Sequence, residues 1–312
     1  MQVSRPVKRS WLLLAMVLAA TLSVVRAGHA APDKVTVCEA DWSDPARGGR
    51  IVPVRIRLPA QAAPVPVILF SHGLGGSLDA GTDWVEAWAA AGFATVNIQH
   101  AGGLREAVTP EQLRNRANDV HFVLDTLAKG GIVNGPNGSC DLGRLDRGRI
   151  GMSGHSFGAQ TTLAISGARY GGLPLLQDRR IAASVAFSPQ PAQGQDDRAA
   201  FGGITIPFFT VTGTRDALPA LNGWTPQDRL RPYEAMTGGG KYLLVIDGAN
   251  HMMLGGQTLS MRTNTPPPAM VATVTASTTL FWRATLLDDR DAAAELQRFG
   301  PRLPAGDRFV AK

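Results

Sequence analysis

Ser156 is the first residue in the sequence whose type and surroundings could do chemistry. It lies in the segment GHSFG, residues 154–158, directly after a short apolar run. A serine between glycines, at the turn from a buried strand into a helix, is typical of a nucleophile elbow that lifts the hydroxyl above a sheet. We expect Gly154 and Gly158 to be required because side chains there would collide with the neighbouring strand and helix. A Gly/Ser-rich connection is the alternative, so the motif needs partners.

A serine hydroxyl becomes nucleophilic beside a base, and in elbow proteins the partners follow in the order Ser, Asp or Glu, His. His251, in DGANHMML, is the one histidine that follows Ser156. Asp216, in FFTVTGTRDALP, lies between them after a strand-like run, where it could orient the imidazole. Asp247 is the alternative acid, but it precedes His251 by only four residues. The sequence therefore predicts a triad of Ser156, His251 and Asp216.

Acyl transfer also needs two backbone N–H groups that stabilise an oxyanion. We predict Phe157, which follows the nucleophile, as one donor. The second is expected from the glycine-rich segment SHGLGGS, residues 71–77, with Leu74 preferred over Gly75. The candidate pocket residues around this centre are Gly75, His100, Trp224 and Met252.

The remaining histidines receive other roles. We expect His72 to order the oxyanion segment, and His155 to pack within the elbow rather than transfer protons. For His100 a structural role is as plausible as a place in the pocket, and His121 belongs to a helix. The histidines and cysteines show no zinc-ligand spacing, and no Gly-x-Gly-x-x-Gly follows a strand. No metal or organic cofactor is expected.

The elements that must position these residues alternate between strand-like and helix-like patterns. Such alternation predicts an α/β domain with a mostly parallel sheet, led by partly antiparallel strands with a bulge at Pro53. In the helix expected at 109–131, Thr109 and Gln112 form a capping-box pattern. The segment between the strands at 181–189 and 207–213 is too short to hold a separate cap domain. Strands are predicted at 34–40, 50–59, 65–73, 93–99, 149–153, 181–189, 207–213 and 241–248, and further helices at 83–92, after Ser156 and at 269–287.

The N-terminus has the three parts of a secretory signal peptide. A basic segment precedes an apolar run at 11–25, and small residues follow, with cleavage expected after Ala30. The apolar run is shorter than the roughly 20 residues of a spanning helix. We therefore expect an exported protein without a stable membrane anchor, with residues 31–312 as one catalytic domain.

Composition excludes some partners and leaves others open. The leader carries four basic residues and no acid, so its removal lowers the net charge from +6 to about +2. Nucleic acid is therefore not an expected partner, and the sequence does not indicate an oligomeric state. Export favours a disulfide between the two cysteines, Cys38 and Cys140, although two separate structural thiols remain the alternative.

The same motifs give the chain a resemblance to α/β-hydrolases, namely the bacterial relatives of platelet-activating-factor acetylhydrolase that are often labelled dienelactone-hydrolase-like. The resemblance covers nearly the whole chain after the leader, from RGGRIVPVRIRLP through ILFSHGLGGS, RIGMSGHSFGAQTTL and FFTVTGTRDALP to VIDGANHMML. It implies the α/β-hydrolase fold, the triad Ser156, Asp216 and His251, and the donors Leu74 and Phe157.

Two departures limit what the resemblance implies about substrate. Dienelactone hydrolases use a cysteine nucleophile where this chain has Ser156, and many relatives have glycine where this chain has Ala159. We therefore expect a serine carboxylesterase acting on short-acyl or lipid-like esters. A polyester or an amide as substrate is the first alternative, and a non-catalytic binding protein of the same fold is the second.

Overall fold

The computed structural model describes residues 1–2, 35–61, 64–103, 108–218, 223–256 and 264–312. The predicted signal peptide lies outside the described residues except for its first two. From Val35 onward the described residues belong to one compact unit. No helix among them is long and apolar enough to cross a membrane.

The centre of this unit is a sheet of nine strands in the order β1-β2-β4-β3-β7-β8-β9-β10-β11. Pairing is parallel from β4 through β3, β7, β8 and β9 to β10, and antiparallel at both ends of the sheet. The prediction of a mostly parallel sheet with antiparallel leading strands is thus confirmed. The strands are β1 (Val35–Asp44), β2 (Arg50–Pro59), β3 (Val65–Ser71), β4 (Ala94–Ile98), β7 (Leu145–His155), β8 (Ile181–Phe187), β9 (Phe208–Arg215), β10 (Lys241–Asn250) and β11 (Arg308–Ala311).

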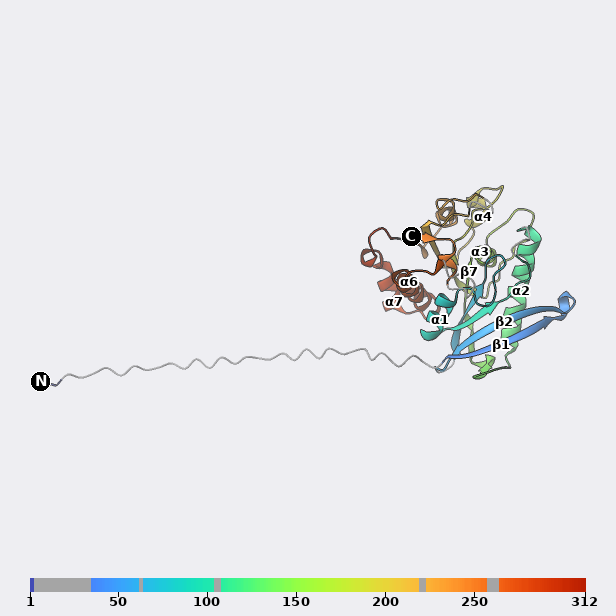
Figure 1. The fold of residues 1–312 in the computed structure, drawn as a ribbon, viewed down its shortest axis with the longest axis horizontal. Coiled ribbons are helices and arrows are strands. Elements are labelled where there is room, and N and C mark those ends of the chain that lie inside the picture. Colours follow the sequence, from blue (N-terminus) through green and yellow to red (C-terminus); the bar gives the residue numbers. More distant parts are fainter. Residues whose placement is uncertain (3–34, 62–63, 104–107, 219–222, 257–263) are drawn as a thin grey trace. The chain divides into compact units, whose positions relative to one another are not determined.

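Helices cover both faces of the sheet, with α2 on one side and α1, α6 and α7 on the other (Figure 1). Strand β3 shows why: Val67 and Leu69 enter the core under α2, whereas Ile68 and Phe70 enter the core under α1 and α6. Successive side chains of a strand point to opposite faces, so a continuous apolar run fits a strand buried on both sides. The helices are α1 (Thr82–Ala90), α2 (Pro110–Lys129), α3 (Phe157–Ile165), α4 (Asp197–Phe201), α5 (Arg231–Ala235), α6 (Pro268–Leu286) and α7 (Arg290–Gln297).

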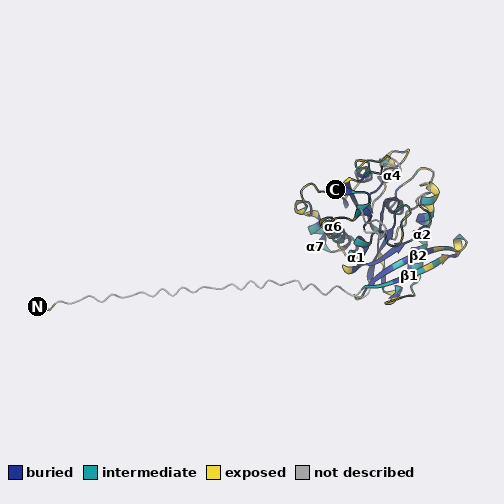
Figure 2. Cartoon of the chain, in the orientation of Figure 1, coloured by how far each residue is buried: buried dark blue, intermediate teal, exposed yellow. Residues whose placement is uncertain are grey.

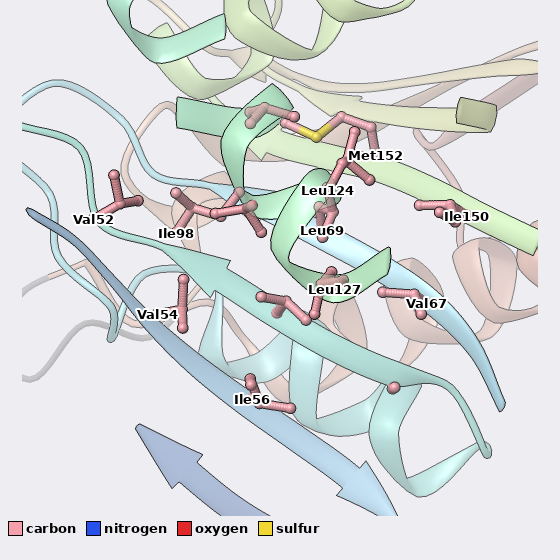
Figure 3. Close-up of a cluster of buried hydrophobic side chains, with 14 of the residues drawn as sticks. Val52, Val54, Ile56, Val67, Leu69, Ile98, Leu124, Leu127, Ile150 and Met152 are labelled. Atoms are coloured by element: carbon pink, nitrogen blue, oxygen red, sulfur yellow. The ribbon is translucent and has the colours of Figure 1, made fainter. Parts of the chain in front are cut away.

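The core under α2 illustrates how the sequence pattern becomes packing. Leu124 and Leu127 of α2 lie over apolar side chains of β2, β3 and β7 (Figure 3). The helix begins with the predicted capping box, in which Thr109 Oγ1 accepts from the Gln112 N–H and the Gln112 side chain bonds back. Buried residues concentrate in the strands, and exposed residues in the loops (Figure 2).

The expected bulge at Pro53 is wrong. Pro53 lies opposite Asp41 in an unbroken β1–β2 register. The pairing of β2 with β4 begins at Val54, and the Pro53 carbonyl accepts from the Gln99 N–H at 2.9 Å, directly after β4.

Cys38 of β1 and Cys140 are joined by a disulfide. Cys140 belongs to a two-stranded sheet of β5 (Ile132–Gly135) and β6 (Gly138–Asp141), which the sequence patterns did not predict. The bond ties this hairpin to the outer strand of the main sheet, at the edge opposite β11. Between β8 and β9 the chain forms one short helix, α4, in place of a cap domain.

Candidate active site

Ser156 occupies a strained turn between β7 and α3. Its φ of 57° lies in the left-handed region that L-residues rarely adopt, and its N–H donates to the Phe187 carbonyl at 3.0 Å. A Cβ on Gly158 would lie 1.9 Å from the Ser71 carbonyl oxygen, and one on Gly154 would lie 2.5 Å from the Gly158 oxygen. The prediction that both glycines are sterically required is confirmed. Strain held in place by tight packing is typical of a functional turn.

The structure brings the three predicted triad residues together from β7, the end of β9 and the end of β10. Ser156 Oγ lies 2.9 Å from His251 Nε2, and His251 Nδ1 lies 2.8 Å from Asp216 Oδ1. Ser156 is 8% exposed and Asp216 is fully buried. The alternative acid, Asp247, is exposed and accepts a hydrogen bond from Thr214 instead.

Asp216 is held as a carboxylate. Burial alone would raise its pKa, but the hydrogen bond with His251 and the charge of Arg229 outweigh burial and bring the pKa down to about 2. Thr212 Oγ1 donates to the other carboxylate oxygen at 2.8 Å. An ionised Asp216 can only accept, so His251 Nδ1 carries the proton and Nε2 is free to accept from Ser156.

Arg229 was not predicted, yet it contacts two members of the triad. This fully buried guanidinium lies 3.3 Å from Asp216 Oδ1, and Nη2 approaches His251 Nδ1 at 3.4 Å. Because Nδ1 already donates to Asp216, the second contact is a close approach and not a hydrogen bond. The ring centre of Trp224, a candidate pocket residue, lies 5.5 Å from the guanidinium carbon of Arg229. Trp224 therefore packs against the residue that contacts the triad. Arg229 follows β9 in a 3-10 helix of three residues, Asp228–Leu230, which is too short to give a periodic signal.

Two predicted oxyanion donors lie on segments that meet at the elbow. Phe157 is the first residue of α3, where an N–H has no partner within the helix. Leu74 follows Gly73, and a Cβ on Gly73 would lie 3.4 Å from Ser156 Cβ. Among the hydrogen bonds of the described residues, none uses the N–H of Leu74 or Phe157.

The other histidines have defined partners. His72 Nδ1 donates to the Gly73 carbonyl at 2.6 Å and His72 Nε2 accepts from the His100 N–H, which matches the expected ordering of the segment. His155 Nε2 donates to the His251 carbonyl at 2.8 Å. His100 does not line an open pocket, since it is 1% exposed and its ring nitrogens contact Ser71 and Asp119. His121 Nε2 contacts the Leu176 carbonyl.

A cavity of about 110 Å³ opens near the elbow. Gln160, one helical turn after Ser156, contributes to its wall, and every lining side chain is uncharged. None of the four predicted pocket residues lines this cavity. Gly75 is exposed, and Trp224 and Met252 are half-buried beside the triad. The cavity is lined by Val108, Thr109, Pro110, Leu113, Gln160, Tyr170, Gly171, Leu173, Gln193 and Gln195.

In the part of the chain that the structure describes, no group of three or more histidine, cysteine, aspartate or glutamate side chains is placed to hold a metal ion.

Comparison with known proteins identifies the fold. No protein-family model matches the chain, and no match was found among curated protein sequences. Among solved structures, a ferulic acid esterase from Streptomyces cinnamoneus is similar, with a TM-score of 0.60 and 19% identity over 84% of this chain and 93% of that chain. The chain thus has the α/β-hydrolase fold, with Ser156 at the strand-to-helix elbow of that fold.

Proposed function

We propose that this chain is an exported serine hydrolase that cleaves carboxylic esters through an acyl-enzyme. The observation that carries the proposal is the continuous hydrogen-bonded path from Ser156 Oγ through His251 to a buried, ionised Asp216. The esterase named in the similar structure makes esters the first substrate class to test. The leader sequence and the disulfide support export.

In the proposed mechanism each step belongs to one group of the site. Ser156 Oγ attacks the ester carbonyl carbon while His251 Nε2 takes the hydroxyl proton. The carbonyl π electrons move to oxygen, and the N–H groups of Leu74 and Phe157 stabilise that oxyanion. Collapse breaks the bond to the alcohol, which leaves with the proton from His251. Water then attacks the acyl carbon and gives its proton to His251. The bond to Ser156 Oγ breaks, the acid is released, and His251 returns the proton to Ser156 Oγ.

The substrate proposal follows from the cavity and from the short connection between β8 and β9. A cavity of about 110 Å³ with uncharged walls suits a short acyl chain or a small neutral group better than a charged one. The resemblance to acetylhydrolase relatives supports short-acyl or lipid-like esters. Because only α4 lies between β8 and β9, polymeric esters and amides form the second candidate class.

Turnover of a p-nitrophenyl ester series from acetyl to dodecanoyl tests this proposal, alongside a feruloyl ester, a polyester film and a peptide anilide. We expect turnover of the shortest esters to be fastest, and Ser156→Ala to abolish it. A folded protein that hydrolyses none of these esters would instead indicate a non-catalytic binding protein. Faster release from the film or the anilide than from acetyl esters would favour the second class.

A further inference from the structure

Arg116 is a buried cation whose direct partners are backbone carbonyls. It belongs to α2 and is 2% exposed. Its Nη1 donates to the His72 oxygen at 2.6 Å, and its Nη2 donates to the Gly73 oxygen at 3.1 Å. No ion pair of the described residues includes it. Burial lowers its pKa to about 9, so it remains charged at neutral pH. A buried charge without a contacting carboxylate is costly, which calls for a role beyond packing.

The carbonyl that Arg116 binds shares one peptide unit with a proposed oxyanion donor. The peptide bond is planar and trans, so the Gly73 C=O and the Leu74 N–H point in opposite directions. The Gly73 oxygen also accepts from His72 Nδ1 at 2.6 Å and from the Gly76 N–H at 3.2 Å. Three donors on one side therefore fix the direction in which the Leu74 N–H points on the other.

The same guanidinium contacts the residue that carries the second donor. The Arg116 guanidinium carbon lies 4.2 Å from the centre of the Phe157 ring. Phe157 begins α3, and its ring is buried in the core under α2. A planar guanidinium can donate along its edge and stack with its face, whereas a lysine ammonium offers one point charge on a flexible stem.

We propose that Arg116 is a positioning residue of the oxyanion hole: it fixes the Leu74 N–H through the Gly73 carbonyl and holds the start of α3 through the Phe157 ring. This proposal rests on the proposed esterase function. In this proposal one residue of α2 sets the relative placement of the Leu74 and Phe157 N–H groups, which lie more than eighty residues apart in the sequence.

The test compares Arg116→Met and Arg116→Lys with Arg144→Lys. Arg144 is a matched control because it too donates to backbone carbonyls, those of Pro59 and Gln61, away from the triad. For each variant, kcat and KM on p-nitrophenyl acetate are measured with the inhibition constant of an alkyl trifluoromethyl ketone. That ketone adds to Ser156 and places an oxyanion in the hole, so its inhibition constant reports donor placement.

We expect Arg116→Met to lower kcat/KM about 10²-fold through kcat, the scale of losing one oxyanion donor, with a smaller loss for Arg116→Lys. The ketone inhibition constant should rise by the same factors, while Arg144→Lys stays within twofold of the unsubstituted protein. Melting temperatures identify the folded variants, and Arg116→Lys carries the test if Arg116→Met does not fold.

Two outcomes would overturn the proposal while leaving the esterase function intact. One is a folded Arg116→Lys with the kcat/KM and inhibition constant of Arg144→Lys. The other is a lower kcat/KM with an unchanged inhibition constant, which would place the effect outside the oxyanion hole. An unsubstituted protein that neither turns over esters nor binds the ketone would instead refute the esterase function itself.

Discussion

Ser71 Oγ lies 2.9 Å from His100 Nε2, the same separation that joins Ser156 Oγ to His251 Nε2. His100 Nδ1 lies 3.0 Å from Asp119 Oδ2, so the described residues include a second Ser-His-Asp array with similar distances. Distances alone therefore do not identify a nucleophile.

The two arrays differ in the burial of the serine and in the partners of the carboxylate. Ser71 and Asp119 are fully buried, and Asp119 already binds the guanidinium groups of Arg47 and Arg50. Ser71 also lies on the regular strand β3, whereas Ser156 occupies the strained elbow. We interpret the Ser71 array as support for the segment that follows β3, and the Ser156 array as the reactive one.

Replacement of the acid should separate the two candidate aspartates. Asp216→Asn keeps the size of the side chain but removes the charge that holds the imidazole tautomer, so we expect kcat on acetyl esters to fall by about 10³–10⁴. Asp247→Asn is the matched control and should retain kcat. Steady-state kinetics on both variants decides the assignment, and equal losses would refute it.

Substitution of the elbow glycine Gly158 should cause a severe steric clash. Gly158→Ala would place a methyl group 1.9 Å from the backbone oxygen of Ser71, so the variant should fail to fold or lose all activity. Gly239→Ala, where no atom lies within 4 Å of the new methyl, should match the unsubstituted protein. Circular dichroism melting with an esterase assay makes the comparison. A folded and fully active Gly158→Ala would show that the elbow does not pack as described.

Much of this architecture can be predicted from periodicity and turn chemistry. The capping box of α2, the elbow glycines and the order of serine, aspartate and histidine are local patterns, and each appears in the structure. The signal for Arg116 was also visible, because it falls on the apolar face of α2 beside Leu113 and Ala117.

Features that depend on the path of the chain could not be predicted in this way. Arg229 lies in the short 3-10 helix Asp228–Leu230, and no local pattern places that helix beside Asp216. Strand β11 is four residues long and is defined by its pairing with β10. The same holds for His100, whose burial follows from the packing of Ser71 and Asp119 around it.

Buried neutral histidines should make the protein less stable in mild acid. Burial lowers the pKa of His155 to about 3 and, despite the hydrogen bond with Asp119, that of His100 to about 4. In the unfolded chain a histidine titrates near about 6.5. Between these values the unfolded state binds protons that the folded state does not, so the free energy of unfolding falls as the pH drops from about 6.5 to about 4.

Urea unfolding at pH 7, 6 and 5 measures this slope. His155→Gln, whose amide nitrogen can still donate to the His251 carbonyl, should reduce the slope by about one proton, or ~1.4 kcal/mol per pH unit. An unchanged slope would mean that His155 is protonated in the folded protein.

The disulfide should contribute stability without contributing to catalysis. It joins residues separated by 102 positions, and in the chain-entropy model a loop of that size gives about 4–5 kcal/mol. The double substitution Cys38→Ser with Cys140→Ser should lower the free energy of unfolding by several kcal/mol and leave kcat at 25 °C unchanged. A large loss of kcat in the folded variant would contradict a purely structural role.

The site of covalent labelling tests the central claim most directly. The protein is treated with a fluorophosphonate, digested, and the modified peptide is identified by mass spectrometry. Because Ser156 lies in the strained elbow and is 8% exposed, whereas Ser71 is fully buried on a regular strand, we predict a single adduct on Ser156 and none on Ser71. The adduct should vanish in Ser156→Ala. An adduct on Ser71, or persistent labelling of Ser156→Ala, would contradict the assignment of Ser156 as the nucleophile.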